Sequence, residues 1–109
     1  MNSNYETAAY PEYAQIPDQA NGTTIDFGSQ GIAMMLSDGT GGKTFKLPDD
    51  DGFMLVLTNT AGSGDILLTD ADSDVTGTVS TDETGLFVRT GSSAAGMKWK
   101  CVLLKSSMT

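Results

Sequence analysis

The chain of 109 residues contains no histidine and only one cysteine, Cys101. Without histidine, it lacks the commonest general base of enzymes and the commonest metal ligand of proteins. A single cysteine excludes an internal disulfide and a zinc site built from cysteines. The usual nucleophile–base pairs are therefore absent, and the sequence predicts neither an enzyme nor a protein with a bound metal or cofactor.

Basic residues are also scarce, since six Lys and Arg stand against 14 Asp and Glu, for a formal net charge of −8. Nucleic acids and anionic membranes both attract clustered Lys and Arg, so the sequence predicts neither a nucleic-acid nor a membrane partner. No segment approaches the roughly 20 consecutive apolar residues of a membrane-spanning helix. The N-terminus lacks the basic region and apolar core of a secretory signal, so we expect synthesis in the cytoplasm.

What the sequence does contain is a series of short apolar runs separated by turn residues. The most apolar run, FMLVL at residues 53–57, is too short for a packed helix but suits a strand covered on both faces. Residues 44–47 alternate polar and apolar side chains, as a half-buried strand does. PDDDG at residues 48–52 lies between them and is a turn, because Pro presets φ, Asp bonds its own backbone and Gly accepts positive φ.

The same signals along the whole chain predict an all-β protein of one domain. The predicted strands are residues 24–27, 32–36, 44–47, 53–57, 65–69, 75–80, 85–90 and 97–104. No window carries the apolar stripe of a helix. About eight short strands at roughly 10-residue spacing, with Gly-rich turns, indicate a β-sandwich or barrel, although the strand order cannot be predicted.

The first 22 residues differ from the rest, because they hold all three tyrosines and two of the three prolines and show no apolar periodicity. We predict an extended N-terminal arm at residues 1–22 in front of a β-sandwich domain at residues 23–109. The alternative is a frayed terminus. Tyrosine offers a large contact area at low entropic cost, which suits an arm that lies on a partner. The candidate partner-binding residues of the arm are Tyr5, Tyr10, Tyr13 and Ile16.

Asp70, Asp72 and Asp74 alternate along the chain as at the start of a calcium-binding loop. A complete loop also needs Gly at its sixth position and Glu at its twelfth, where this chain has Val75 and Thr81. We therefore interpret the three residues as an acidic turn. The aspartates of residues 49–51 are interpreted as a second, solvated turn.

Met34 and Met35 are adjacent, so in a strand one of them must face outward or into a neighbour. Methionine either fills irregular gaps in a core or forms an adaptable contact surface. The candidate oligomer contacts are Met34 and Met35. Cys101 shares an apolar strand face with Trp99, so we expect an unreactive core thiol.

Between residues 45 and 99 the order of strands and turns resembles small β-sandwich proteins of tailed-phage virions. The shared features are Leu47-Pro48, Gly52 before an apolar strand that ends in Asn59-Thr60, a turn at 62–65, a strand at 66–69 with an acidic turn, a strand at 83–88, and Trp99. The proteins it resembles are jelly-roll capsid decoration (cement) proteins and domains of fibres and tails. The resemblance covers about half of the chain and carries no catalytic residues.

The resemblance implies a jelly-roll-like sandwich that assembles as a homotrimer on the capsid exterior of a phage virion. It also implies an arm that crosses a neighbouring subunit or the major capsid protein and so clamps coat subunits together. One alternative is a fibre or knob subunit that binds a host-surface glycan. Another is a free-standing carbohydrate-binding module, for which Trp99 and Phe87 are the candidate stacking platforms.

Overall fold

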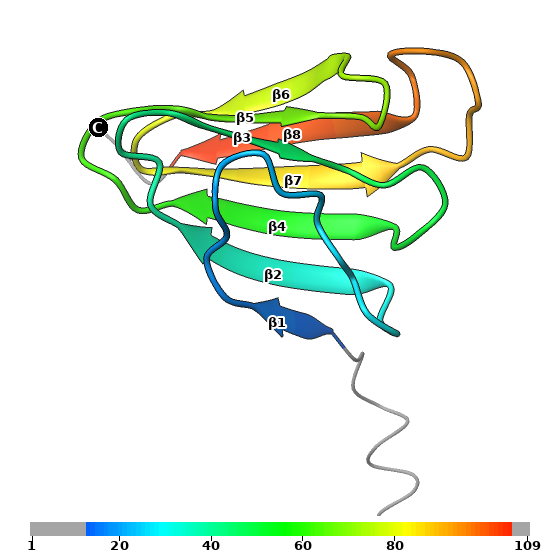
Figure 1. The fold of residues 1–109 in the computed structure, drawn as a ribbon, viewed down its shortest axis with the longest axis horizontal. Coiled ribbons are helices and arrows are strands. Elements are labelled where there is room, and N and C mark those ends of the chain that lie inside the picture. Colours follow the sequence, from blue (N-terminus) through cyan, green and yellow to red (C-terminus); the bar gives the residue numbers. More distant parts are fainter. Residues whose placement is uncertain (1–12, 106–109) are drawn as a thin grey trace, which may run out of the picture.

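The computed structural model describes residues 13–105, which fold into strands without any helix in that range (Figure 1). The strands are β1 (Ala14–Ile16), β2 (Ile32–Ser37), β3 (Lys43–Lys46), β4 (Met54–Asn59), β5 (Ile66–Thr69), β6 (Val75–Val79), β7 (Glu83–Arg89) and β8 (Trp99–Lys105). They form a five-stranded sheet in the order β1-β2-β4-β7-β8 and a three-stranded sheet in the order β3-β5-β6. The predicted all-β sandwich of about eight short strands is confirmed.

Seven of the predicted strands are present, with ends displaced by one or two residues. The predicted strand at residues 24–27 is the exception. It makes a single bridge, from Thr24 to Lys46 of β3, although Ile25 and Phe27 are buried. β1 was not predicted, because its three residues are too few to show an alternating pattern.

The first half of the described chain winds as a flat coil that passes alternately through the two sheets (Figure 1). Successive turns of the coil lie side by side in parallel, so that β1 pairs with β2, β2 with β4, and β3 with β5. One turn takes about 22 residues, since Ile32 pairs with Met54, 22 residues later, and Lys43 with Ile66, 23 later. The Thr24–Lys46 bridge belongs to the same coil.

The second half of the chain closes the sandwich with antiparallel strands. β6 pairs with β5, β7 with β4, and β8 with β7. Three of the six strand pairs are therefore parallel, whereas the jelly roll belongs to the antiparallel architectures. The structure supports the broader class, a β-sandwich with mixed sheets.

The core lies between the two sheets and beneath residues 23–30, which cover the inner side of the large sheet at its β1 end. Its largest member, Trp99, stacks on Phe27 with ring centroids 5.9 Å apart. The indole Nε1 donates a hydrogen bond to the carbonyl oxygen of Pro48 at 2.9 Å. Gly52 in the same turn has a φ of 69°, and a Cβ there would lie 2.4 Å from the Phe27 ring, so only glycine fits.

The sandwich begins at Ala14 and not at residue 23 as predicted. β1 pairs with β2 in parallel, from Ala14 opposite Ala33 to Ile16 opposite Met35. Ala14 and Ile16 also pack against the core. Residues 14–22 are therefore corrected from the predicted arm to the sandwich, and residues 1–12 lie outside the described residues.

Candidate interaction surface

Of the predicted contact residues, some lie outside the described residues, some are exposed and some belong to the core. Tyr5 and Tyr10 lie outside the described residues, and Tyr13 is half-exposed at the start of β1. Ile16, predicted as an arm contact, is corrected to a core contact, because it packs against the buried cluster. Met34 points outward from β2, whereas Met35 is buried in the core and is corrected from the predicted oligomer contacts.

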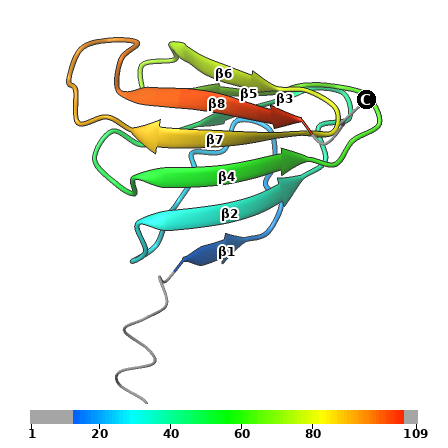
Figure 2. The ribbon, with the colours of Figure 1, turned by 180° about the vertical axis from the view of Figure 1, so that it is seen from behind.

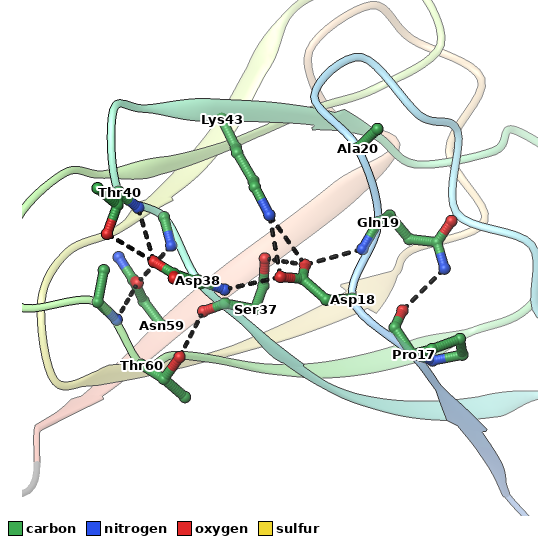
Figure 3. A network of polar contacts seen from close by, with 12 residues as sticks. Pro17, Asp18, Gln19, Ala20, Ser37, Asp38, Thr40, Lys43, Asn59 and Thr60 are labelled. Carbon is green, nitrogen blue, oxygen red and sulfur yellow. Dashed lines mark hydrogen bonds and ion pairs between the residues drawn. The ribbon is translucent and has the colours of Figure 1, made fainter.

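A carboxylate just after β1 holds the start of the sandwich in place (Figure 3). Asp18 Oδ1 accepts a hydrogen bond from Ser37 Oγ at 2.6 Å, and Asp18 Oδ2 accepts one from the backbone N–H of Asp38 at 3.1 Å. Lys43 Nζ lies 3.0 Å from both carboxylate oxygens. Ser37 belongs to β2 in the large sheet and Lys43 to β3 in the small sheet. The Asp18 side chain therefore links the segment after β1 to both sheets.

The pKa of Asp18 reflects these contacts. Burial raises the pKa, but the hydrogen bonds from Ser37, the Asp38 backbone and Lys43 outweigh burial and lower it from 3.8 to about 2. The folded state therefore holds this carboxylate ionised more strongly than the unfolded chain does.

We expect Asp18→Asn to lower the free energy of unfolding by about 1 kcal/mol at pH 7, because the carboxylate is partly exposed and its interactions are screened. A carboxylate whose pKa is lower in the folded state stabilises the folded protein at pH values above its unfolded pKa. This stabilisation is lost as the pH falls from 3.8 towards about 2. The stabilities of wild type and variant should therefore converge over that interval, as measured by urea unfolding at several pH values. Asp65→Asn, which removes an exposed carboxylate outside the network, is the control. A gap that stays constant with pH would contradict this assignment.

One side of the five-stranded sheet points away from the core, and we call the part of it formed by β2, β4, β7 and β8 the outer face. Strand register arranges its side chains in three rows that cross β2, β4, β7 and β8. The rows are Ile32-Met54-Val88-Lys100, Met34-Val56-Leu86-Val102 and Leu36-Thr58-Thr84-Leu104. Figure 2 looks onto this side, and no described segment crosses in front of these four strands.

The outer face is mostly apolar. Nine of its 12 side chains are Ile, Leu, Val or Met, and all 12 are exposed or half-exposed. Its two threonines satisfy each other, since the hydroxyls of Thr58 and Thr84 are 2.8 Å apart across β4 and β7. Lys100, at one corner, is its only charged residue. The acidic residues of the described chain all lie elsewhere, on turns, loops and the inward side of β7.

The predicted acidic turn after β5 is built around a buried carboxylate. Asp70 Oδ1 accepts hydrogen bonds from the backbone N–H groups of Asp72 at 2.9 Å and Asp74 at 3.0 Å. Lys98 Nζ bonds the carboxylates of Asp72 at 2.7 Å and Asp49 at 3.1 Å, and these two contacts raise its pKa. The carboxylates of Asp70, Asp72 and Asp74 come within 4.8 Å of one another. Their contacts hold the turn and tie it to the 48–52 turn, so we assign them a structural role.

The aromatic residues considered for sugar binding are unavailable for it. Trp99 and Phe87 are both fully buried in the core, so neither can offer a ring face to a ligand. The hypothesis of a carbohydrate-binding module therefore has no support from these two residues. Cys101 packs against the same core, and burial, with a smaller effect of Glu83, raises the pKa of its thiol, as expected for an unreactive cysteine.

Of the outer face, sequence reasoning named only Met34 as a contact residue, although it interpreted residues 53–57 as a strand covered on both faces. The signal for the others was present as apolar runs that do not alternate, such as Val102-Leu103-Leu104 in β8. A strand buried on one face alternates apolar and polar residues, so an unbroken run indicates that both faces are covered.

Comparisons with protein-family models, curated proteins and solved structures find no match to this chain. Within residues 13–105 there is also no helix long and apolar enough to cross a membrane.

Proposed function

We propose that the protein is a structural component of a phage virion, located on the capsid exterior, where it decorates the shell and clamps neighbouring coat subunits as a homotrimer. The observation that carries the proposal is the outer face, a flat apolar surface of a kind that marks contact with another protein. The virion setting comes from the resemblance of residues 45–99 to decoration proteins.

The place of β1 in the fold supports the clamp. β1, where the described residues begin, is the edge strand of the five-stranded sheet. Tyr13, next to this strand, is half-exposed. An aromatic segment attached at a sheet edge is well placed to lie on a neighbouring capsid subunit, with the major capsid protein as partner.

Deleting residues 1–12 tests the clamp and leaves β1 and Asp18 in the chain. We expect the shortened chain to fold like the wild type by circular dichroism, but to bind empty capsids more weakly and to protect them less against heat. Tyr13→Ser should weaken binding in the same direction. Its matched control is Phe53→Ser, because Tyr13 and Phe53 are 50% and 48% exposed. Unchanged capsid binding by the shortened chain would refute the clamp.

A fibre or tail subunit is the second candidate, and the parallel coil favours it. Stacked parallel turns of chain are the building plan of β-solenoids, which extend along one direction as fibres do. Electron microscopy of particles that carry gold-labelled protein separates the two candidates. Label over the shell supports decoration, whereas label confined to tail or fibres supports the second candidate and refutes the first.

A further inference from the structure

We propose that the outer face is the surface through which copies of this chain bind one another, so that its occupant is a second copy. This inference rests on the self-association contained in the proposed function and adds one surface that performs it. Two copies joined face to face form a two-fold pair, so a trimer needs a second contact besides this one. The inference concerns the 12 side chains of the three rows across β2, β4, β7 and β8.

The two sheets differ in a way that indicates burial of the outer face. In the three-stranded sheet, the two edge strands contain polar residues, since β3 reads KTFK and β6 reads VTGTV, and only the central strand β5 begins with an apolar run, ILL. In the five-stranded sheet, β2 begins IAMML and β4 begins MLVL without a polar residue. Strands of a sheet that is buried on one face alternate apolar and polar residues. Uninterrupted apolar runs are typical of a sheet that is covered on both faces. The described chain covers only the inner side (Figure 2).

The polar groups of the outer face are compatible with removal from water. Thr58 and Thr84 already bond each other, so burial leaves neither hydroxyl unpaired. Lys100 occupies a corner row position on β8, from which a long side chain can keep its ammonium group in water. A partner can therefore cover the face without leaving a hydroxyl unpaired or the lysine charge buried.

The distribution of charge makes the outer face the place where two copies can meet with the least repulsion. The chain carries a net charge of −8, which makes its copies repel each other over most orientations. The outer face contains no carboxylate, so contact through it keeps the acidic loops of both copies away from the interface. Each copy also presents the same apolar rows to the other, as a symmetric interface requires.

The area of the face sets the expected strength. Four strands about 4.8 Å apart, each contributing five residues at about 3.4 Å, cover on the order of 300 Å². Two such faces in contact bury on the order of 600 Å² of flat area, and more as accessible surface because side chains rise from the sheet. In accessible surface the buried area is therefore at the low end of specific interfaces, which corresponds to weak assembly that depends on protein concentration.

The test compares charged substitutions on and off the outer face in the full chain. Leu36→Glu and Val102→Glu place a carboxylate in two of the rows, and Val75→Glu on β6 places one outside them. The three sites match in exposure, at 60%, 56% and 59%, so the folded monomer should tolerate all three equally. Circular dichroism and thermal unfolding confirm that each variant folds.

Sedimentation equilibrium from about 1 μM to 1 mM, a range suited to weak interfaces, measures the assembly. We expect the wild type to assemble as concentration rises. Leu36→Glu and Val102→Glu should each raise the dissociation constant at least about tenfold, because a buried unpaired carboxylate is costly. Val75→Glu should match the wild type. A wild type that stays monomeric, or assembly that both face variants leave unchanged, overturns the proposal.

Other occupants of the face give distinct results. If residues 1–12 covered it, deleting them from a monomeric wild type would create assembly and binding of a hydrophobic dye. If a coat protein covered it, a monomeric wild type would bind capsids and Val102→Glu would not. Either result overturns the proposal of a second copy. Capsid binding by the wild type tests the proposed function separately, since self-association is measured without capsids.

Discussion

Asn59→Ala is expected to lower the free energy of unfolding by about 3–5 kcal/mol, a large share of the stability of a domain of this size. Asn59 is fully buried at the end of β4, and its amide makes four hydrogen bonds with backbone groups. Its Oδ1 accepts from the N–H groups of Gly39 at 3.1 Å and Ala61 at 3.0 Å. Its Nδ2 donates to the carbonyls of Gly64 at 2.9 Å and Val79 at 3.0 Å. Truncation leaves four backbone groups without their partner, three of them in buried hydrogen bonds.

Chemical denaturation of wild type and variant measures the loss. Asn21→Ala is a matched control, because Asn21 is exposed and accepts one hydrogen bond, from the N–H of Thr44 at 2.7 Å. We expect that control to cost about 1 kcal/mol. Equal effects of the two substitutions would show that the buried network does not hold the sheets together.

Asn59→Asp distinguishes the donors from the acceptors of this amide. The substitution keeps the oxygen that accepts from Gly39 and Ala61 but turns a second oxygen towards two carbonyls. The carboxylate form is then disfavoured in the folded state, which raises its folded pKa above the unfolded value. Stability is therefore lost as the pH rises, and this variant should approach the wild type at acidic pH.

Trp99→Ala is expected to cost about 3–5 kcal/mol, the range for removing a large aromatic side chain from a core. Trp99 connects three parts of the sandwich, since it begins β8, stacks on Phe27 and donates to Pro48 in the 48–52 turn. Truncation opens a cavity and releases both contacts. Because Trp99 is the only tryptophan, unfolding is followed by circular dichroism.

Trp99→Phe separates the ring from its hydrogen bond. The smaller ring keeps the apolar contact with Phe27 but loses the donor to Pro48, so we expect a cost of about 1–2 kcal/mol. If both substitutions cost the same, the hydrogen bond and not the ring volume would account for the role of Trp99.

The strands were predictable because their pattern is local. Residues 44–47 alternate around the buried Phe45, and residues 53–57 contain the core residues Leu55 and Leu57. The turn at 48–52 was predictable from its Pro, Asp and Gly. β1 was not, because Ala14–Ile16 is a three-residue strand defined by its pairing with β2 and not by its own sequence.

The arrangement of the strands depends on contacts that no local pattern encodes. β4 pairs in parallel with β2 and antiparallel with β7, and nothing in its four apolar residues distinguishes these partners. For the same reason, the sequence indicates Asn59 only as the end of a strand. Its four partners come from residues 39, 61, 64 and 79, which meet only in the folded chain.

The candidate surface was predictable only in part. Adjacent methionines required that one of the pair face outward, but the sequence could not tell which, and Met34 is the outward one. Aromatic residues suggested sugar binding by Trp99 and Phe87, yet both are core residues, because composition does not reveal which side of a strand is covered.

The coiled path of the first half of the chain makes the sandwich modular. Each circuit adds one strand to the large sheet and one extended segment to the small side, while β6, β7 and β8 terminate the stack at its other end. A relative built on this plan could grow by inserting a whole circuit of about 22 residues, widening each layer by about 4.8 Å without rebuilding the terminating strands. The width of the sandwich is thus a quantity that evolution, or a designer, can change in discrete steps.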